Sequence, residues 1–346
     1  MILDGNDAKS IAIGAELIKG GELLGLPTET VYGLAADADN ATAVAKIFKM
    51  KGRPADHPLI VHVLDCASVA HFAASVPDFA AKLIEAFWPG PLTLILPRRE
   101  GVAATAAGGQ DSIGLRCPSH PVAQALLQAC LTSVGADAKT VWGMAAPSAN
   151  PFGRVSPTTA QHVQDEFGDD LLILDGGACP VGIESTIIDC TRGQPVLLRP
   201  GAITPAQVQA VCGLKVLLKD EPQTLVAPAP RAAGTLASHY APNATVRLMT
   251  TDDLQTALDL LAPDLSCDAS GGKPRIAIYA RTHLNTASRH LLCRRMPEAA
   301  EATARQLFAV LRDFDAQGVQ QIWIESPPAT PAWEGVRDRL LRASAS

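Results

Sequence analysis

Seven short polar motifs, each at the end of an apolar run, constrain the fold of this chain more than any other feature. In each motif, hydroxyl or cationic side chains come directly where the apolar run stops. The motifs are PTET (27–30), KGRPADHPLIVH (51–62), SIGLRCPSHP (112–121), APSAN (146–150), GRVSPTT (153–159), GIEST (182–186) and LLRPG (197–201). Because ligands of α/β proteins bind where strands end and loops gather, this pattern predicts a single polar pocket at the end of a sheet.

The remaining pattern of the first two thirds of the chain predicts an α/β fold with a mixed, twisted sheet. The chain is expected to bend at Gly33, and the later strands follow one another without intervening helices, which disfavours a regular βαβ winding. The predicted helices cover 8–19, 40–50, 78–87, 121–131 and about 158–167. The predicted strands cover 22–27, 58–64, 91–97, 112–118, 143–147, 171–175, 185–190 and 195–199.

Changes of composition divide the chain into three regions. Residues 1–212 form a predicted N-terminal α/β domain, 213–244 a Pro- and Ala-rich linker without apolar periodicity, and 245–346 a small C-terminal domain. Alternation of strands and helices predicts a Rossmann-like parallel sheet there. No GxGxxG follows its first strand, so this fold prediction carries no dinucleotide site. The predicted strands are 246–250, 275–280 and 322–326, and the predicted helices are 252–262, 298–316 and 331–343.

Composition excludes several classes of protein. The net charge is −6, and residues 1–205 hold 21 Asp and Glu against 14 Lys and Arg, which disfavours a basic nucleic-acid surface. Eight cysteines without a CxxC pair are expected to be buried, small and apolar in a reducing compartment. No secretory signal and no apolar run of about 18 residues is present, so we expect a cytoplasmic protein without membrane contact. GxSxG, GxxxxGK[ST] and HExxH are absent as well.

Each polar motif also has a purely structural interpretation. Thr28 and Thr30 are typical turn residues, and Lys51 with Arg53 would complement the dipole of a helix end. His62 could be a hydrogen-bonded core histidine, and Ser148 and Asn150 could form a helix cap or a turn. Arg199 could be a surface charge. Arg116 stands between apolar residues, and a buried arginine needs either an anionic ligand or an Asp or Glu partner. Taken together, the motifs suit a zwitterion bound beside phosphates.

The order and content of these motifs resemble the YrdC family of threonylcarbamoyl-AMP synthases, in its long two-domain form. The resemblance rests on PTETVYGLAADA, the KxR of KGRP, HPLIVHV, WPGPLTLIL, LRCPSHP, APSAN with GRVSPTT, GIESTIID and LLRPGAI, followed by RAAGTLASHYAPNA. It implies a nucleotidyltransferase that condenses L-threonine, bicarbonate or CO2, and ATP to threonylcarbamoyl-AMP, with release of pyrophosphate. It also implies Mg²⁺ bound with ATP, delivery of the product to a tRNA threonylcarbamoyl transferase complex, and room for a weak contact with tRNA.

The resemblance also implies roles for single residues. The residues implied at threonine are Thr28, His62, Arg116, Ala146 and Ser185, with Arg116 on the carboxylate. The residues implied at ATP are Lys51, Arg53, His57, Ser112, Ser148, Ser156, Arg199 and Tyr240. Lys51 and Arg53 are the implied catalytic pair, Tyr240 lies on the linker, which would act as a lid, and no protein cluster is expected to hold a metal.

Two departures from the family pattern affect these roles. His57 stands where the family often has Asn, which puts its nucleotide contact in doubt. The segment 132–144 is longer than in many relatives and could shift the loop near Ala146. Two rivals remain: a module that binds double-stranded RNA or serves ribosome maturation, and a carbamoyl-transfer enzyme of the hydrogenase-maturation kind. The second would need zinc-finger Cys pairs and an acylphosphatase-like segment, which the sequence lacks.

Overall fold

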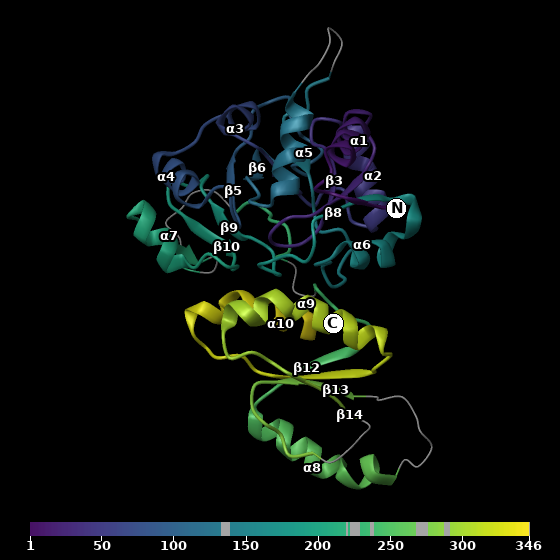
Figure 1. Ribbon diagram of the computed structural model, residues 1–346. Helices are drawn as coiled ribbons and strands as arrows, with labels where there is room; N and C mark the ends of the chain where they lie inside the picture. The colour runs from purple at the N-terminus through teal and green to yellow at the C-terminus, as the bar shows by residue number, and fades with distance from the viewer. Residues whose placement is uncertain are drawn as a thin grey trace. The chain divides into compact units, whose positions relative to one another are not determined.

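The computed structural model describes residues 1–132, 139–218, 221, 229–235, 239–267, 276–286 and 291–345. These residues form two compact units, one of residues 1–152 with 156–235 and one of residues 153–155 with 236–346 (Figure 1). Among them, no helix combines the length and the apolarity needed to cross a bilayer. The domain boundaries expected from the sequence stay predictions, because residues 219–220, 222–228 and 236–238 of the predicted linker 213–244 lie outside the described residues.

The larger unit is built on a mixed sheet, as the sequence predicts. Its 11 described strands lie in the order β1-β8-β2-β3-β7-β4-β6-β5-β9-β10-β11, with both parallel and antiparallel neighbours. The first six strands are β1 (Ile2–Asp4), β2 (Leu24–Leu26), β3 (Gly33–Asp37), β4 (Ile60–His62), β5 (Leu92–Pro97) and β6 (Ser112–Arg116). The others are β7 (Met144–Ala145), β8 (Leu172–Asp175), β9 (Thr186–Asp189), β10 (Val196–Arg199) and β11 (Leu217–Leu218).

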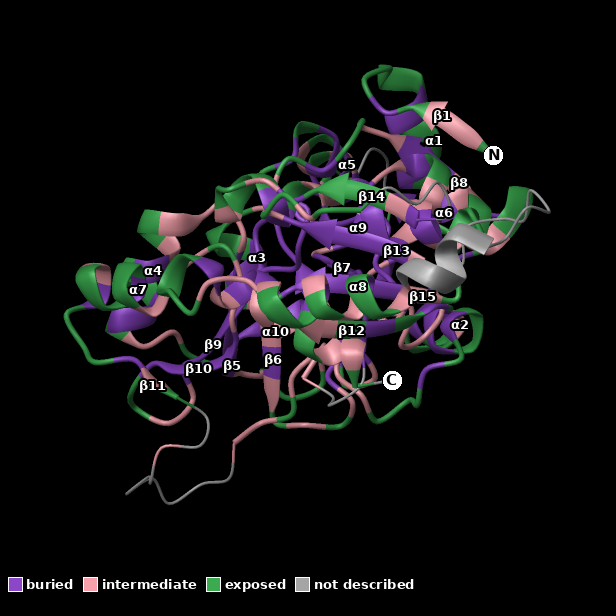
Figure 2. Cartoon of the chain, turned by 90° about the horizontal axis from the view of Figure 1, so that it is seen from below, coloured by how far each residue is buried: buried purple, intermediate pink, exposed green. Residues whose placement is uncertain are grey.

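Apolar side chains lie on both faces of this sheet, and helices cover it. Along β5, for example, Leu94 joins the large cluster beneath α2, α3 and α4, whereas Ile95 packs with residues of β9 and β10. The strands β5, β9 and β10 are accordingly buried along most of their length (Figure 2). The helices are α1 (Ala8–Lys19), α2 (Ala41–Lys51), α3 (Cys66–Phe72), α4 (Asp78–Phe87), α5 (Pro121–Leu131), α6 (Ala160–Phe167), the 3₁₀ turn η1 (Gly168–Asp170) and α7 (Pro205–Cys212).

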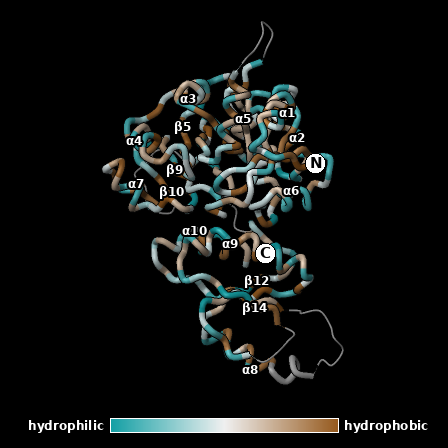
Figure 3. The backbone as a smooth tube through the Cα atoms, viewed as in Figure 1, coloured by the Kyte–Doolittle hydropathy of each residue, from teal (hydrophilic) through white to brown (hydrophobic). Residues whose placement is uncertain are grey.

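The smaller unit has a separate sheet of four described strands that are all parallel, in the order β12-β15-β13-β14. Helix α8 lies on one face of this sheet, and α9 and α10 lie on the other (Figure 1). Brown and teal positions alternate along α9 and α10 in Figure 3, as expected for helices with one buried face. The elements are β12 (Thr245–Met249), α8 (Thr251–Cys267), β13 (Ile276–Ala280), β14 (Leu291–Arg295), α9 (Ala300–Ala316), β15 (Gln321–Glu325), η2 (Pro331–Trp333) and α10 (Glu334–Ser344).

Some predictions about local structure were wrong. The chain does not simply bend at Gly33, because Gly33 begins the strand β3, which pairs with β2 and β7. The sequence analysis also missed β1, α3, α7, β11 and β14, which are short or weakly patterned. Finally, Cys66 and Cys293 are exposed, whereas the other five cysteines whose side chains are described are buried as expected; all seven are free thiols.

We expect Leu94→Ala to lower the free energy of unfolding of the larger unit by about 2–5 kcal/mol, because Leu94 is fully buried and its loss leaves a cavity. The matched control is Ile13→Ala on α1, where the side chain is 48% exposed and the expected change is under about 1 kcal/mol. Urea unfolding followed by circular dichroism measures both. Equal losses in the two variants would contradict this view of the core.

Candidate active site

The turn after β2 is organised by the hydroxyl of Thr28. Its Oγ1 accepts hydrogen bonds from the backbone N–H groups of Thr30 (3.3 Å) and Val31 (3.2 Å), and it lies 3.0 Å from Thr30 Oγ1. Such hydroxyl turns replace the Gly or Asn turns that more often end a strand. Thr28 is therefore a turn residue, as its structural interpretation predicts. The turn also directs Glu29 and Thr30 towards Arg116.

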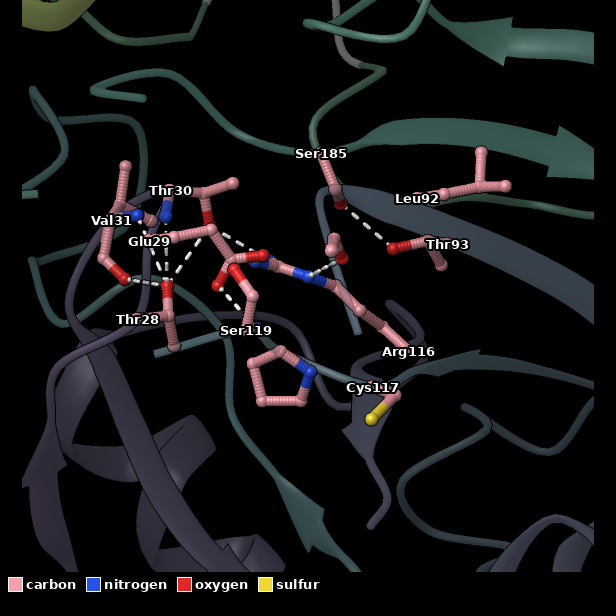
Figure 4. A network of polar contacts seen from close by, with 12 residues as sticks. Thr28, Glu29, Thr30, Val31, Leu92, Thr93, Arg116, Cys117, Ser119 and Ser185 are labelled. Atoms are coloured by element: carbon pink, nitrogen blue, oxygen red, sulfur yellow. Dashed lines mark hydrogen bonds and ion pairs between the residues drawn. The ribbon is translucent and has the colours of Figure 1, made fainter. Parts of the chain in front are cut away.

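Arg116 lies at the end of β6 and is only 4% exposed. Each nitrogen of its guanidinium group has a partner: Nη2 lies 2.6 Å from Glu29 Oε1, Nη1 donates to Thr30 Oγ1 (2.8 Å), and Nε donates to the Gly90 carbonyl (3.2 Å) (Figure 4). The other carboxylate oxygen of Glu29 accepts from the N–H of Ser119 (3.1 Å). The sequence left an anionic ligand or an acidic partner open for Arg116, and the structure supplies the acidic partner.

His62 is the residue opposite Arg116 in the β4–β6 pair. It is 3% exposed, and its Nδ1 has no hydrogen-bond partner among the described residues. Burial and then the neighbouring charge of Arg116 lower the pKa of His62 from its ordinary value to about 3. The imidazole is therefore neutral at physiological pH, with a ring nitrogen that can accept or donate a hydrogen bond.

Ser185 and Arg199 touch each other, although the resemblance implies them at different substrates. Arg199 Nη2 donates to Ser185 Oγ (3.1 Å) and to the Ser185 carbonyl (2.9 Å), and Arg199 Nη1 donates to the Ala233 carbonyl (3.0 Å). Ser185 Oγ also lies 2.8 Å from Thr93 Oγ1, close to the Arg116 network (Figure 4). The two predicted sets of residues therefore meet at Ser185, and Arg199 is not a surface charge, since it is only 3% exposed.

Lys51 is the last residue of α2, yet its side chain does more than complement the helix end. It is 3% exposed, and its Nζ donates to the carbonyls of Ser148 (2.6 Å) and Asn150. Burial, and then the charge of Arg53, lower the pKa of the Lys51 ammonium well below its ordinary value. Lys51 thus joins the end of α2 to the APSAN motif, which itself is bridged to β3 through Gly33 and Ser148.

Arg53 follows directly after the left-handed residue Gly52, whose φ of 62° ends the helix. Arg53 Nη2 donates to the Pro58 carbonyl (2.9 Å), and its guanidinium lies 5.7 Å from the centre of the Phe152 ring. His57 meets the same ring edge-on, with 5.5 Å between ring centroids, and burial followed by Arg53 lowers the pKa of His57. His57 is therefore near the cations expected at the nucleotide, although its contact with a nucleotide remains a prediction.

The remaining implied residues are distributed as follows. Ser156 is fully buried and donates to Glu184 Oε1, while Ala146 donates through its N–H to the Ile60 carbonyl (3.0 Å). Ser112, at the start of β6, lines a small cavity with Thr93. Of the longer segment 132–144, residues 133–138 lie outside the described residues, and the flanking Trp142 stacks on His71 with 5.0 Å between centroids.

Tyr240, the last of the implied residues, belongs to the smaller unit. It is a non-glycine residue with φ of 63°. Its ring lies 5.5 Å from that of Phe308, and the Arg339 guanidinium lies 5.3 Å from its centre. The nucleotide contact of Tyr240 stays a prediction.

The residues that make contacts at this site without a ligand role assigned from the sequence include Glu29, Thr30, Thr93, Asn150 and Glu184. Glu29 and Glu184 each stand inside a motif of the sequence, PTET and GIEST, beside residues that were assigned. Both are less than 10% exposed, and a buried carboxylate is rare unless it is paired. In the part of the chain that the structure describes, no group of three or more His, Cys, Asp or Glu side chains is placed to hold a metal ion.

Comparison with known proteins gives a consistent result over both units. A family model for Sua5, YciO and YrdC proteins, described as "Telomere recombination", matches residues 16–201, and one described as "Threonylcarbamoyl-AMP synthase, C-terminal domain" matches residues 203–345. The chain is 35% identical to the threonylcarbamoyl-AMP synthase of Pyrococcus abyssi, covering 96% of this chain and 94% of that one. It is 34% identical to the enzyme of that name from Bacillus subtilis, covering 99% and 94%.

A solved structure of P. abyssi Sua5 complexed with L-threonine is also similar. It has a TM-score of 0.84 and 33% identity, and the match covers 99% of this chain and 97% of that one. A variant of the same protein with His and Tyr replaced by Ala has the same TM-score of 0.84 and 33% identity, covering 99% and 96%.

The low pKa of His62 predicts a pH dependence of stability. Between pH 6.5 and about 3 the unfolded chain takes up a proton at His62 and the folded protein does not, so the free energy of unfolding falls as the pH falls. From pH 6.5 to 5.5 this residue alone contributes a loss of about 1 kcal/mol. His62→Gln removes that contribution, which urea unfolding of both proteins across this range measures. Parallel pH profiles for the two proteins would show that His62 does not carry the effect.

Proposed function

Because the chain belongs to the Sua5/YciO/YrdC family, we propose that it is a threonylcarbamoyl-AMP synthase, which joins L-threonine, bicarbonate or CO2, and ATP and releases pyrophosphate. The observation that carries the proposal is the convergence of the polar motifs in the larger unit. Arg116 contacts the PTET turn, and Gly90 and Pro91, just before β5, accept hydrogen bonds from Arg116 and from Thr186 of GIEST. Arg199, at the end of β10, donates to Ser185 of the same motif.

Threonine is assigned to the side of the site around Arg116. A guanidinium group holds a carboxylate through two parallel N–H groups, and hydroxyls complete the recognition of a small polar ligand. Thr28, His62, Ala146 and Ser185 lie on the strands and turns that adjoin Arg116 in the sheet. We assign these five residues to threonine.

ATP is assigned to the cations held by the loops after α2 and β10. Lys51 and Arg53 follow each other at one helix end, and Lys51 holds the Ser148 carbonyl. Phosphate anions would favour the charged form of Lys51, because an opposite charge nearby raises the pKa of an ammonium group. The full set assigned to ATP is Lys51, Arg53, His57, Ser112, Ser148, Ser156, Arg199 and Tyr240.

The chemistry needs positioning more than a covalent nucleophile. The threonine amine adds to CO2 to form a carbamate, and a carbamate oxygen then attacks the α-phosphorus as pyrophosphate leaves. Holding two reactants in register supplies roughly 7–11 kcal/mol of the barrier in favourable geometry, and fixed cations stabilise the charge that develops on the phosphate. Mg²⁺ is assigned to the phosphate oxygens and water, where it would neutralise phosphate charge, since protein carboxylates often contribute few of its ligands.

The linker is assigned the role of a lid over a reactive mixed anhydride. Its described residues 229–235 support this, since they lie within the larger unit against the assigned nucleotide residues. Arg231 pairs with Asp56 (2.7 Å), next to His57, and the Ala233 carbonyl accepts from Arg199. We further propose a cytoplasmic enzyme that passes its product to a tRNA threonylcarbamoyl transferase complex and makes at most a weak contact with tRNA.

We expect Arg116→Ala to lower threonine-dependent pyrophosphate release by at least about 100-fold, because the substrate carboxylate loses its charge-assisted hydrogen bonds. Arg247→Ala, at an exposed position of β12, is the control and should keep normal activity. Mass spectrometry of wild-type protein mixed with L-threonine, bicarbonate and Mg-ATP should show threonylcarbamoyl-AMP. Normal turnover by Arg116→Ala would remove the assignment of the carboxylate. Tight, salt-resistant tRNA binding without this product would instead favour an RNA-binding module.

A further inference from the structure

Glu29 is the acidic residue bound directly to the predicted carboxylate-binding arginine. Glu29 and Arg116 are 3% and 4% exposed, and 2.6 Å separates Oε1 from Nη2. The family resemblance assigns Arg116 but gives Glu29 no role. Removing one partner of a buried ion pair leaves an uncompensated charge, so the two residues act as one electrically neutral unit.

The pair leaves Arg116 able to take a ligand. A guanidinium group has five N–H groups. In Arg116, Nε and Nη1 each donate one hydrogen bond, to Gly90 and Thr30, whereas Nη2 lies 2.6 Å from Glu29 Oε1 in an ion pair and has no hydrogen-bond partner among the described residues. The remaining N–H groups of Nη1 and Nη2 can still meet a carboxylate, while Glu29 offsets the positive charge.

Apart from Arg199, the groups named here beside the pair carry no charge of their own. Thr28, Thr30 and Ser185 present hydroxyls, and His62 is buried and neutral. Burial raises the pKa of the Cys117 thiol, which therefore stays protonated. Arg199 donates to Ser185, and the proposed function assigns its charge to the phosphates of ATP.

Resting on the proposed function, we propose that Glu29 is a specificity-determining residue, which keeps the site around Arg116 neutral so that it accepts a zwitterionic amino acid and rejects a plain carboxylate. A zwitterion adds no net charge to a neutral buried site. A ligand with the carboxylate but without the ammonium adds a full negative charge, and burying an uncompensated charge is costly. Without Glu29 the site is cationic, and the preference shifts towards the anion.

Isothermal titration calorimetry at neutral pH tests this with two ligands, L-threonine and 3-hydroxybutyrate, which lacks only the amino group. We expect the wild-type protein to bind L-threonine at least about 100-fold more tightly than 3-hydroxybutyrate. In Glu29→Gln this ratio should fall at least about tenfold, because the variant loses affinity for the zwitterion or gains it for the anion. A residue that only supports the fold would weaken both ligands by the same factor.

Thr30→Val is the matched control. It removes the neutral partner of Arg116 Nη1 and leaves the charge of the site unchanged. It should weaken both ligands alike and keep their affinity ratio within about threefold of wild type. If Glu29→Gln does not fold, Glu29→Asp retains the charge on a shorter side chain and should likewise keep the ratio.

The outcomes separate this inference from the function on which it rests. Binding of L-threonine by the wild-type protein, with the same ligand ratio in Glu29→Gln as in wild type, overturns the role of Glu29 alone. If the wild-type protein binds L-threonine and 3-hydroxybutyrate with similar affinities, the role of Glu29 is overturned as well, whatever the variants do. No binding of L-threonine by the wild-type protein overturns the proposed function, and the inference with it.

Discussion

The candidate site depends on how the fold compensates the charge of one cationic side chain that is buried among apolar residues. Arg116 stands between Leu115 and Cys117 on a strand in the interior of the sheet, where an unpaired charge would be costly. The PTET turn supplies the answer, since the hydroxyl of Thr28 fixes a turn from which Glu29 and Thr30 reach the guanidinium. The ion pair and these hydrogen bonds therefore stabilise the fold, and the N–H groups of Arg116 Nη1 and Nη2 that carry no hydrogen bond leave it able to bind a ligand.

The other cations of the site share one kind of partner, because each donates hydrogen bonds to backbone carbonyls. Lys51 donates to Ser148 and Asn150, Arg53 to Pro58, and Arg199 to Ser185. A carbonyl orients an ammonium or guanidinium group without cancelling its charge, whereas a carboxylate does both. This difference fits the proposed division of the site, with neutral surroundings of Arg116 for a zwitterion and oriented cations for the phosphates of ATP.

The two units bring polar groups at strand ends together in different ways. In the larger unit, mixed strand directions bring the ends of β4, β6 and β9 next to turns that are distant in the sequence, and these turns carry the polar groups. In the smaller unit, Glu325 at the end of β15 accepts hydrogen bonds from the N–H groups of Arg281 and Thr282, which follow β13. Burial alone would raise the pKa of Glu325, but these hydrogen bonds lower it overall, so this carboxylate ties strand ends together within the unit.

The sequence by itself determined the elements with a strong local signal, and it singled out most of the polar residues whose contacts the candidate site contains, although their roles at a ligand stay predictions. Helices such as 78–87 and 121–131 have clear apolar periodicity and proline or capping signals at their ends, and the structure gives them the same bounds. The need of Arg116 for an anionic partner also followed from its apolar neighbours alone. Only the tertiary structure decided that this partner is Glu29, because the PTET turn and β6 are far apart in the chain and local patterns of residues carry no information about which segments become neighbours. It also decided that Ser185 and Arg199 touch, since β9 pairs with β10, and that Gly33 begins a strand, since β3 pairs with β2 and β7.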